Sequence, residues 1–158
     1  MTRYHSAMLA VLGLIAAMLT AALFYEHVDG QEPCPLCLTQ RIGFLLAGLM
    51  AFIALIENPG RPIYTVLVAL SSLAGAGFSL RQIYLQSLPP GQAPACGPGL
   101  DYMIEVFPAS EVLRAMTLGT GDCAAVDWSL LGLSMAGWAL LGFIAVIVLA
   151  VSPFVLRR

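Results

Sequence analysis

The sequence contains no lysine, and only 10% of its 158 residues are charged. Soluble domains carry about 25% charged residues, so this shortfall indicates a chain that folds in lipid. Hydrophobic residues make up 59% of the chain, and the net charge is −2. A nucleic-acid surface needs a basic patch, so we expect no nucleic-acid partner. The sequence also lacks internal repeats and any haem or flavin motif.

Four long apolar runs are present, and they predict an all-α integral membrane four-helix bundle that forms one domain over residues 1–158. A helix needs about 20 mostly apolar residues to cross a hydrocarbon core of about 30 Å. We expect spans at about residues 7–25, 36–56, 63–85 and 130–156. The long connection before the last span mixes apolar and acidic residues at 100–116, which predicts short interfacial helices on an extracytoplasmic loop.

The arginines predict the orientation of these spans. Arg3, Arg61 and the pair Arg157 and Arg158 fall at the N-terminus, the short turn after the second span and the C-terminus. An even number of spans places these three regions on one side of the membrane. Positive residues stay cytoplasmic, so we expect both termini inside and the two cysteine-bearing loops outside.

An alternative for the first apolar run is a cleaved signal peptide, because Arg3 precedes it and Thr20-Ala21-Ala22 lies near its end. The run is long for a signal peptide and ends in Phe24-Tyr25, a typical interfacial anchor, which favours a membrane span. Cleavage would leave the sidedness of the remaining chain unchanged.

Small residues recur at every fourth position in three of the runs. Such ridges let helices approach closely in lipid, so they predict helix packing and carry no chemistry. The ridges are Gly13/Ala17/Ala21, Gly43/Ala47/Ala51 and Ser71/Gly75/Ser79.

The most informative motif is the Cys-x-x-Cys of Cys34 and Cys37. A second helix that began only after Arg41 would have 15 residues up to position 56 and span about 22 Å, too short for the core. The helix therefore begins near Cys34, and Pro35 suits its first position. Cys37 then lies in the first turn, where unpaired N–H groups and the helix dipole favour a thiolate. Arg41, one turn further on the same face, predicts a charge that stabilises this thiolate or a nearby electron acceptor.

Three simpler interpretations compete with this one. Half of a zinc site is disfavoured because Cys96 and Cys123 do not form a second short pair, so we expect no metal. A purely structural disulfide is more plausible, and Arg41 by itself is typical of a snorkelling interfacial residue. The redox interpretation is favoured because the cysteine pair and the arginine occur together at one helix start.

All four cysteines fall on the outward side, where disulfides are stable. Four cysteines allow three pairings, and the residues alone leave the choice open. Two pairs on one side suggest a relay, in which a partner's thiolate attacks Cys96, and released Cys123 then attacks Cys34 and frees Cys37. In a membrane the expected two-electron acceptor is a quinone.

One long stretch and two shorter motifs match a known family. They are Pro33-Cys34-x-x-Cys37-x-x-x-Arg41, Cys96 in the second outward loop, and Gly121-Asp122-Cys123-Ala124-x-x-x-Trp128-x-x-Leu131-Gly132-Leu133-x-Met135-x-x-Trp138. With these motifs the sequence resembles the bacterial DsbB family of disulfide bond formation proteins over nearly its whole length. The resemblance implies a multi-pass protein of the bacterial inner membrane with periplasmic cysteine loops. It also implies that the chain reoxidises a periplasmic DsbA-like thiol oxidase and reduces ubiquinone or menaquinone.

The resemblance also implies a role for each site residue. It pairs Cys34 with Cys37 as the quinone-coupled disulfide, with Cys37 facing the quinone. It pairs Cys96 with Cys123 as the loop disulfide, with Cys96 forming the mixed disulfide with the partner.

Two further residues are assigned to the quinone by resemblance. Arg41 polarises the quinone, and Met135 lies near its ring. Some relatives carry a histidine near the end of the third helix, but this chain has only His5 and His27, so a proton route through that histidine does not transfer.

Two other functions fit part of the pattern. A structural four-span protein with disulfide-stapled outer loops shares the topology, but it leaves the Cys-x-x-Cys and Arg41 unexplained. A relative of the quinone-dependent epoxide reductases would also use a Cys-x-x-Cys, but there it is expected after the loop cysteines, whereas here it precedes them.

Overall fold

The computed structural model describes residues 3–28, 30, 32–57, 61–89, 91–126 and 128–155. Four long helices dominate it, and each is long and apolar enough to cross a membrane. This confirms the predicted four-helix membrane bundle, and the chain is a multi-pass membrane protein. The helices are α1 (Arg3–Val28), α2 (Pro35–Glu57), α3 (Pro62–Gln86) and α6 (Met135–Val155).

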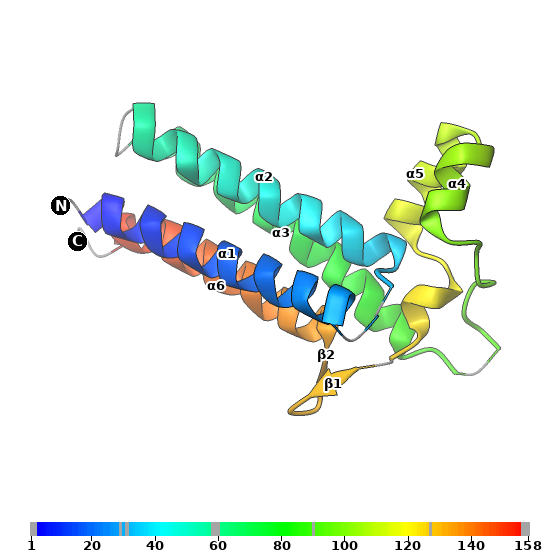
Figure 1. Ribbon diagram of the computed structural model, residues 1–158. Helices are drawn as coiled ribbons and strands as arrows, with labels where there is room; N and C mark the ends of the chain where they lie inside the picture. The colour runs from blue at the N-terminus through cyan, green and yellow to red at the C-terminus, as the bar shows by residue number, and fades with distance from the viewer. Residues whose placement is uncertain are drawn as a thin grey trace.

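The four helices form a bundle in which α1 and α3 each pack against both α2 and α6 (Figure 1). The first turn of α1, the last turns of α2 and α6 and the first turn of α3 lie at one end of this bundle. The segments that carry the four cysteines lie at the opposite end. The cysteines are therefore separated from the start of α1 and the end of α6 by the length of the spans.

The start of α2 confirms the position derived from span length. The helix begins at Pro35, and the Leu38 N–H donates to the Cys34 carbonyl oxygen at 3.2 Å. Cys34 therefore directly precedes the helix, and Cys37 lies in its first turn, where N–H groups have no partner within the helix.

The long outward connection carries the expected short helices. They are α4 (Leu100–Val106), α5 (Ala109–Leu118) and a 3-10 helix, η1 (Gly121–Ala124). The Thr39 hydroxyl donates to the Met116 carbonyl at 2.8 Å, and Arg81 Nε donates to the Leu118 carbonyl at 3.2 Å. These two bonds tie the end of α5 to the bundle and place η1 beside the start of α2.

A small hairpin precedes α6, which begins at Met135 and not near Leu130 as the apolar run predicted. Strands β1 (Ser129–Leu130) and β2 (Leu133–Ser134) pair antiparallel. The two residues between them, Leu131 at φ 54° and Gly132 at φ 81°, are both left-handed, as a tight two-residue hairpin loop requires. Apolar composition alone could not distinguish this turn from a helix. The predicted end of the span, residue 156, lies outside the described residues.

The centre of the bundle is an aromatic stack between α2 and α6. The rings of Phe44 and Phe143 lie 3.8 Å apart at an interplanar angle of 6°. Phe143 is fully buried, and its ring lies directly over Gly75 of α3. The absence of a side chain at Gly75 therefore makes room for the stack.

Two of the three predicted ridges pack as expected. Ala47 and Ala51 of α2 and Ser79 of α3 are fully buried, and Gly75 of α3 is also buried. The ridge on α1 does not pack within this chain, because Gly13 faces away from the bundle and no atom lies within 4 Å of the position of a Cβ there. Periodicity identified this ridge but could not tell which face of α1 meets the other helices.

Candidate active site

The Cys34 and Cys37 side chains lie together at the start of α2. Their sulphur atoms are 2.9 Å apart, and the Cys37 N–H donates to Cys34 Sγ at 3.4 Å. A disulfide bond measures about 2.0 Å, so a small movement closes this pair. All four cysteines are free thiols in the structure. The disulfides Cys34–Cys37 and Cys96–Cys123 therefore remain predictions.

Cys123 lies beside Cys34, although 89 positions separate them in the sequence. It is fully buried in η1 and packs with Leu36 and Leu85. Its sulphur is hydrogen-bonded first to Cys34 and then to backbone N–H groups that include that of Leu36 in the first turn of α2. These donors lower the pKa of Cys123 to about 6. The Cys34 thiol first, and then these backbone N–H groups, therefore favour a thiolate on Cys123 at neutral pH in the reduced protein.

The pKa of Cys34 moves in the opposite direction. It lies well above its ordinary value because a proton on Cys34 is held by Cys123 and then by Cys37, and because the group is buried. Cys34 is therefore the protonated member that contacts both neighbours. The three sulphurs form a continuous series, Cys123 to Cys34 to Cys37, in which the central sulphur can bond to either side.

Cys96 is the exposed member of the set. Its segment is tied to η1, because the Gly121 N–H donates to the Ala95 carbonyl at 3.1 Å and the Gly97 N–H donates to Asp122 Oδ2 at 3.2 Å. The hydrogen bond to Asp122 and the negative charge of that carboxylate raise the pKa of Cys96. Cys96 is thus accessible to an external thiol, whereas Cys123 is shielded from solvent.

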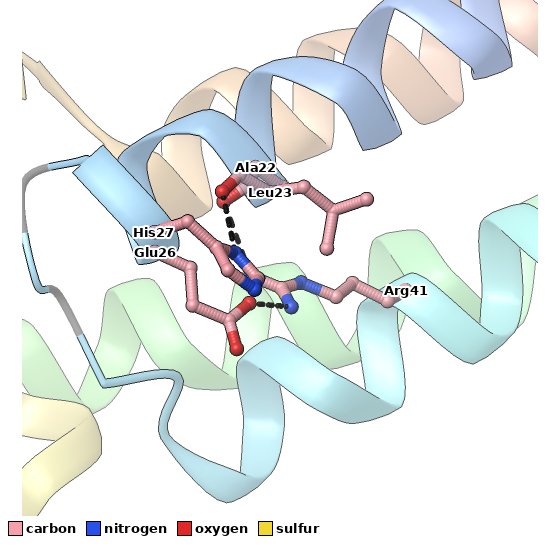
Figure 2. Close-up of polar contacts among 5 residues, drawn as sticks. All are labelled: Ala22, Leu23, Glu26, His27 and Arg41. Carbon is pink, nitrogen blue, oxygen red and sulfur yellow. Dashed lines mark hydrogen bonds and ion pairs between the residues drawn. The ribbon is translucent and has the colours of Figure 1, made fainter.

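Arg41 forms an ion pair with Glu26 in the last turns of α1 (Figure 2). Its Nη2 also donates to the Ala22 carbonyl at 3.3 Å. Within this turn, His27 Nδ1 is hydrogen-bonded to the Leu23 carbonyl at 3.0 Å. The guanidinium is therefore oriented by α1. The predicted first span ended at about residue 25, whereas α1 continues to Val28, so the sequence did not predict this contact of Glu26.

Two buried glutamines lie against the Cys34–Cys37 pair. Gln82 Nε2 of α3 lies 3.3 Å from Cys37 Sγ and 3.4 Å from Cys34 Sγ. Gln40 Nε2 of α2 donates to Gln82 Oε1 at 2.7 Å. Gln82 was not among the predicted site residues. A polar residue within a membrane span was the available signal for it.

A cavity of about 320 Å³ adjoins the dithiol. Its walls come from α1, α2, α3, the segment before the hairpin and the start of α6, and they are mostly apolar. Cys37, Arg41 and Met135, the three residues assigned to a quinone by resemblance, all line this cavity, as does Cys34. Cys96 and Cys123 do not. Within the described residues, no cluster of histidine, cysteine or acidic side chains is suited to a metal ion.

The position of Met135 depends on the hairpin that precedes α6. The Ser134 hydroxyl donates to Gln86 Oε1 of α3 at 2.8 Å, and Trp138 Nε1 donates to the Leu130 carbonyl at 3.2 Å. These bonds hold the hairpin against the bundle and bring the first turn of α6 to the cavity.

A dithiol at the start of a membrane helix, a third thiol in contact with it and an adjoining cavity define a membrane-embedded thiol–disulfide oxidoreductase. The family model described as "Disulfide bond formation protein DsbB" matches residues 4–152, which is nearly the whole chain. The chain belongs to this family and is a disulfide-forming membrane protein.

Similar proteins support the same assignment. The "Disulfide bond formation protein B" of Hahella chejuensis is 49% identical over 146 residues, which cover 90% of this chain and 86% of that protein. That of Marinobacter nauticus is 48% identical over 146 residues with the same coverage. The "Disulfide bond formation protein B 1" of Pseudomonas aeruginosa is 47% identical over 154 residues, covering 96% of this chain and 93% of that protein.

Proposed function

We propose that this chain reoxidises a DsbA-like periplasmic thiol oxidase and passes the two electrons to a membrane quinone. The observation that carries the proposal is the position of Cys34, which contacts both Cys123 of the outward loop and Cys37 at the cavity. The Cys34 sulphur thereby links the outward loop pair, Cys96 and Cys123, to the pair at the cavity, Cys34 and Cys37. A structural protein with stapled loops has no need of this contact.

We further propose that the chain lies in the bacterial inner membrane with both termini cytoplasmic and the cysteines periplasmic. Arg3 begins α1 and Arg61 directly precedes α3, and the starts of these two helices lie at the end of the bundle away from the cysteine-bearing segments (Figure 1), which supports this orientation. An oxidising periplasm is also the compartment in which loop disulfides persist.

The exchange starts from the two disulfides Cys96–Cys123 and Cys34–Cys37. A partner thiolate attacks Cys96, forming a mixed disulfide and releasing Cys123 as a thiolate. The partner's second thiol then attacks the mixed disulfide, which releases the oxidised partner and leaves Cys96 as a thiol. Cys123 attacks Cys34, forming a Cys34–Cys123 disulfide and releasing Cys37. Attack by Cys96 on Cys123 restores the loop disulfide and leaves Cys34 and Cys37 reduced, so two electrons and two protons have moved from the partner to this pair.

The cavity fits a quinone head group. Its volume lies in the range of about 300–1,000 Å³ typical of small-molecule sites, and a mostly apolar lining with a few polar groups is typical of such sites. Cys37, Arg41 and Met135 would hold the head group, with the Arg41 N–H groups available to a carbonyl oxygen. A bound quinone supplies the acceptor for the two electrons of the dithiol. Arg41 favours negative charge in the cavity, and Glu26 holds its guanidinium in place.

The test is anaerobic turnover of the purified protein with a reduced DsbA-type partner, followed by quinone absorbance. We expect loss of the quinone signal, and Cys37→Ala should slow it by about three orders of magnitude because a residue that acts within a catalytic unit is removed. Turnover that persists in Cys37→Ala would contradict the proposal. Disulfides that do not exchange with the partner at all would instead indicate a structural four-span protein.

Replacing Arg41 with alanine should raise the apparent KM for quinone about tenfold, a change worth about 1.4 kcal/mol. The reason is that the variant removes the only cationic side chain of the described residues that lines the cavity. Steady-state assays at varied quinone concentration measure the change, with Arg114→Ala on the exposed face of α5 as the control. An unchanged KM in well-folded Arg41→Ala would argue against this role for the arginine.

A further inference from the structure

The Gln82 side chain contacts both sulphurs of the dithiol from a neighbouring helix. Its exposed fraction is 3%, and that of Gln40 is 5%, so neither amide relies on water for its hydrogen bonds. Gln82 Nε2 lies at a similar distance from Cys34 Sγ and Cys37 Sγ, 3.4 Å and 3.3 Å. The Gln82 Nε2 group is therefore positioned to contact both sulphurs of the pair at once.

The orientation of the Gln82 amide follows from its other contact. Its oxygen accepts a short hydrogen bond from Gln40 Nε2 at 2.7 Å and a long one from the Cys37 thiol at 3.7 Å. With the oxygen already engaged, the two N–H groups of Gln82 remain for the two sulphurs. Gln40 therefore orients the donor end of Gln82 toward the cysteines.

An N–H donor favours the form of sulphur that carries negative charge. Hydrogen bonds to charged groups are stronger than those between neutral groups, and a buried setting strengthens them further. Among the described residues, the side chains in hydrogen-bond contact with Cys37 Sγ are those of Cys34 and Gln82. The Arg41 guanidinium is instead oriented toward Glu26. Apart from the Cys34 thiol, the side-chain donor that contacts the Cys37 sulphur among the described residues is therefore the neutral amide of Gln82.

We propose that Gln82, oriented by Gln40, is a positioning residue that stabilises the reduced Cys34–Cys37 pair and the departing Cys37 sulphur, and thereby raises the reduction potential of this pair. The inference deepens the proposed function and rests on it, because it requires a redox-active Cys34–Cys37 disulfide. It assigns to a glutamine of α3 a part of the charge stabilisation that the sequence pattern assigned to Arg41 and to the start of the helix.

The test measures the potential of the pair without quinone. The full-length protein carries Cys96→Ser and Cys123→Ser, so that only Cys34 and Cys37 titrate, and is equilibrated in dithiothreitol redox buffers before thiol trapping with a maleimide. Gln82→Leu should shift the equilibrium about tenfold toward the disulfide, which corresponds to a potential about 30 mV more negative. Leucine retains the bulk of glutamine but provides no donor.

A second variant keeps Gln82 itself in place. Gln40→Leu removes the bond that orients the amide, so the donor end should face the sulphurs for only part of the time. We expect a shift of the same sign but smaller, about two- to fivefold, because the contact is weakened and not removed. Ser79→Ala is the matched control, since the hydroxyl of this buried residue of α3 donates to the Gly75 carbonyl of its own helix at 3.1 Å, and its loss should leave the midpoint unchanged.

The outcomes separate the inference from the function on which it rests. If the parent pair titrates and both glutamine variants have the parent's midpoint, the role of Gln82 is refuted while the proposed function stands. If the parent pair forms no disulfide in any buffer, the proposed function fails, and the inference fails with it. Should Gln82→Leu not accumulate as folded protein, the midpoint of Gln40→Leu decides the question.

Discussion

Replacing Cys123 with serine should stop turnover with a reduced dithiol partner, slowing it by about three orders of magnitude. Cys123 is the loop sulphur that contacts Cys34, and Cys96 is exposed and does not line the cavity. Without Cys123 the partner's electrons have no sulphur through which to reach Cys34. We therefore expect the partner to remain reduced while Cys34 and Cys37 remain oxidised.

Stopped-flow mixing with reduced partner, followed by acid quenching and thiol trapping, measures this transfer. Ala124→Ser is a suitable control, because it adds a hydroxyl to the neighbouring residue of η1 and removes no thiol. Reduction of Cys34 and Cys37 at the parent rate in Cys123→Ser would show that electrons reach the pair by another route.

The titration of Cys123 in the fully reduced protein provides a second readout, since Cys34 can donate to Cys123 only while Cys34 is a thiol. The pKa of Cys123 is lowered to about 6, first by its hydrogen bond with Cys34 and then by backbone N–H groups. A lowered pKa leaves the thiolate dominant above that value, so the thiolate absorbance of Cys123, taken as the difference between the parent and Cys123→Ser, should be nearly constant at neutral pH. It should fall as the pH drops through about 6. A difference signal that instead keeps rising between pH 7 and 9 would indicate an unperturbed thiol.

Gly75→Ala should strongly destabilise the bundle, by about 1–3 kcal/mol or more. A Cβ at this position would overlap three ring atoms of Phe143, and even the farthest of them, Cε2, would lie only 2.7 Å away. The ring has little freedom to move, because it is fully buried and stacked on Phe44 at 3.8 Å. The separation of α3 and α6 would therefore have to increase.

Thermal unfolding of the detergent-solubilised protein, followed by aggregation or loss of helical signal, measures the effect. Gly77→Ala is the matched control, since it lies on the same helix and has no atom within 4 Å of its Cβ position. That variant should be as stable as the parent or slightly more so, because alanine is the better helix former. Equal unfolding temperatures for Gly75→Ala and Gly77→Ala would show that the contact between α3 and α6 is not tight.

The sequence by itself determined the number of spans and the environment of the first cysteine pair. Lipid requires every backbone polar group to be bonded within the segment, so a long apolar run has only one regular structure available. The minimum length of a span then set the start of α2 near Cys34, which placed Cys37 in a first helical turn. The hairpin turn at Leu131 and Gly132 was not predicted, because its apolar residues resemble the start of a membrane span.

Only the tertiary structure decided which side chains meet at the site. The contacts of Cys123 with Cys34, of Gln82 with both sulphurs and of Glu26 with Arg41 join different elements of the chain. Helical periodicity groups residues on one face of one helix, but it carries no information on which face of a neighbour they will meet. That choice depends on how side chains fill the space between helices. The Phe143 ring fills the space over Gly75, whereas at Gly13, in the exposed ridge of α1, no side chain from another helix comes close.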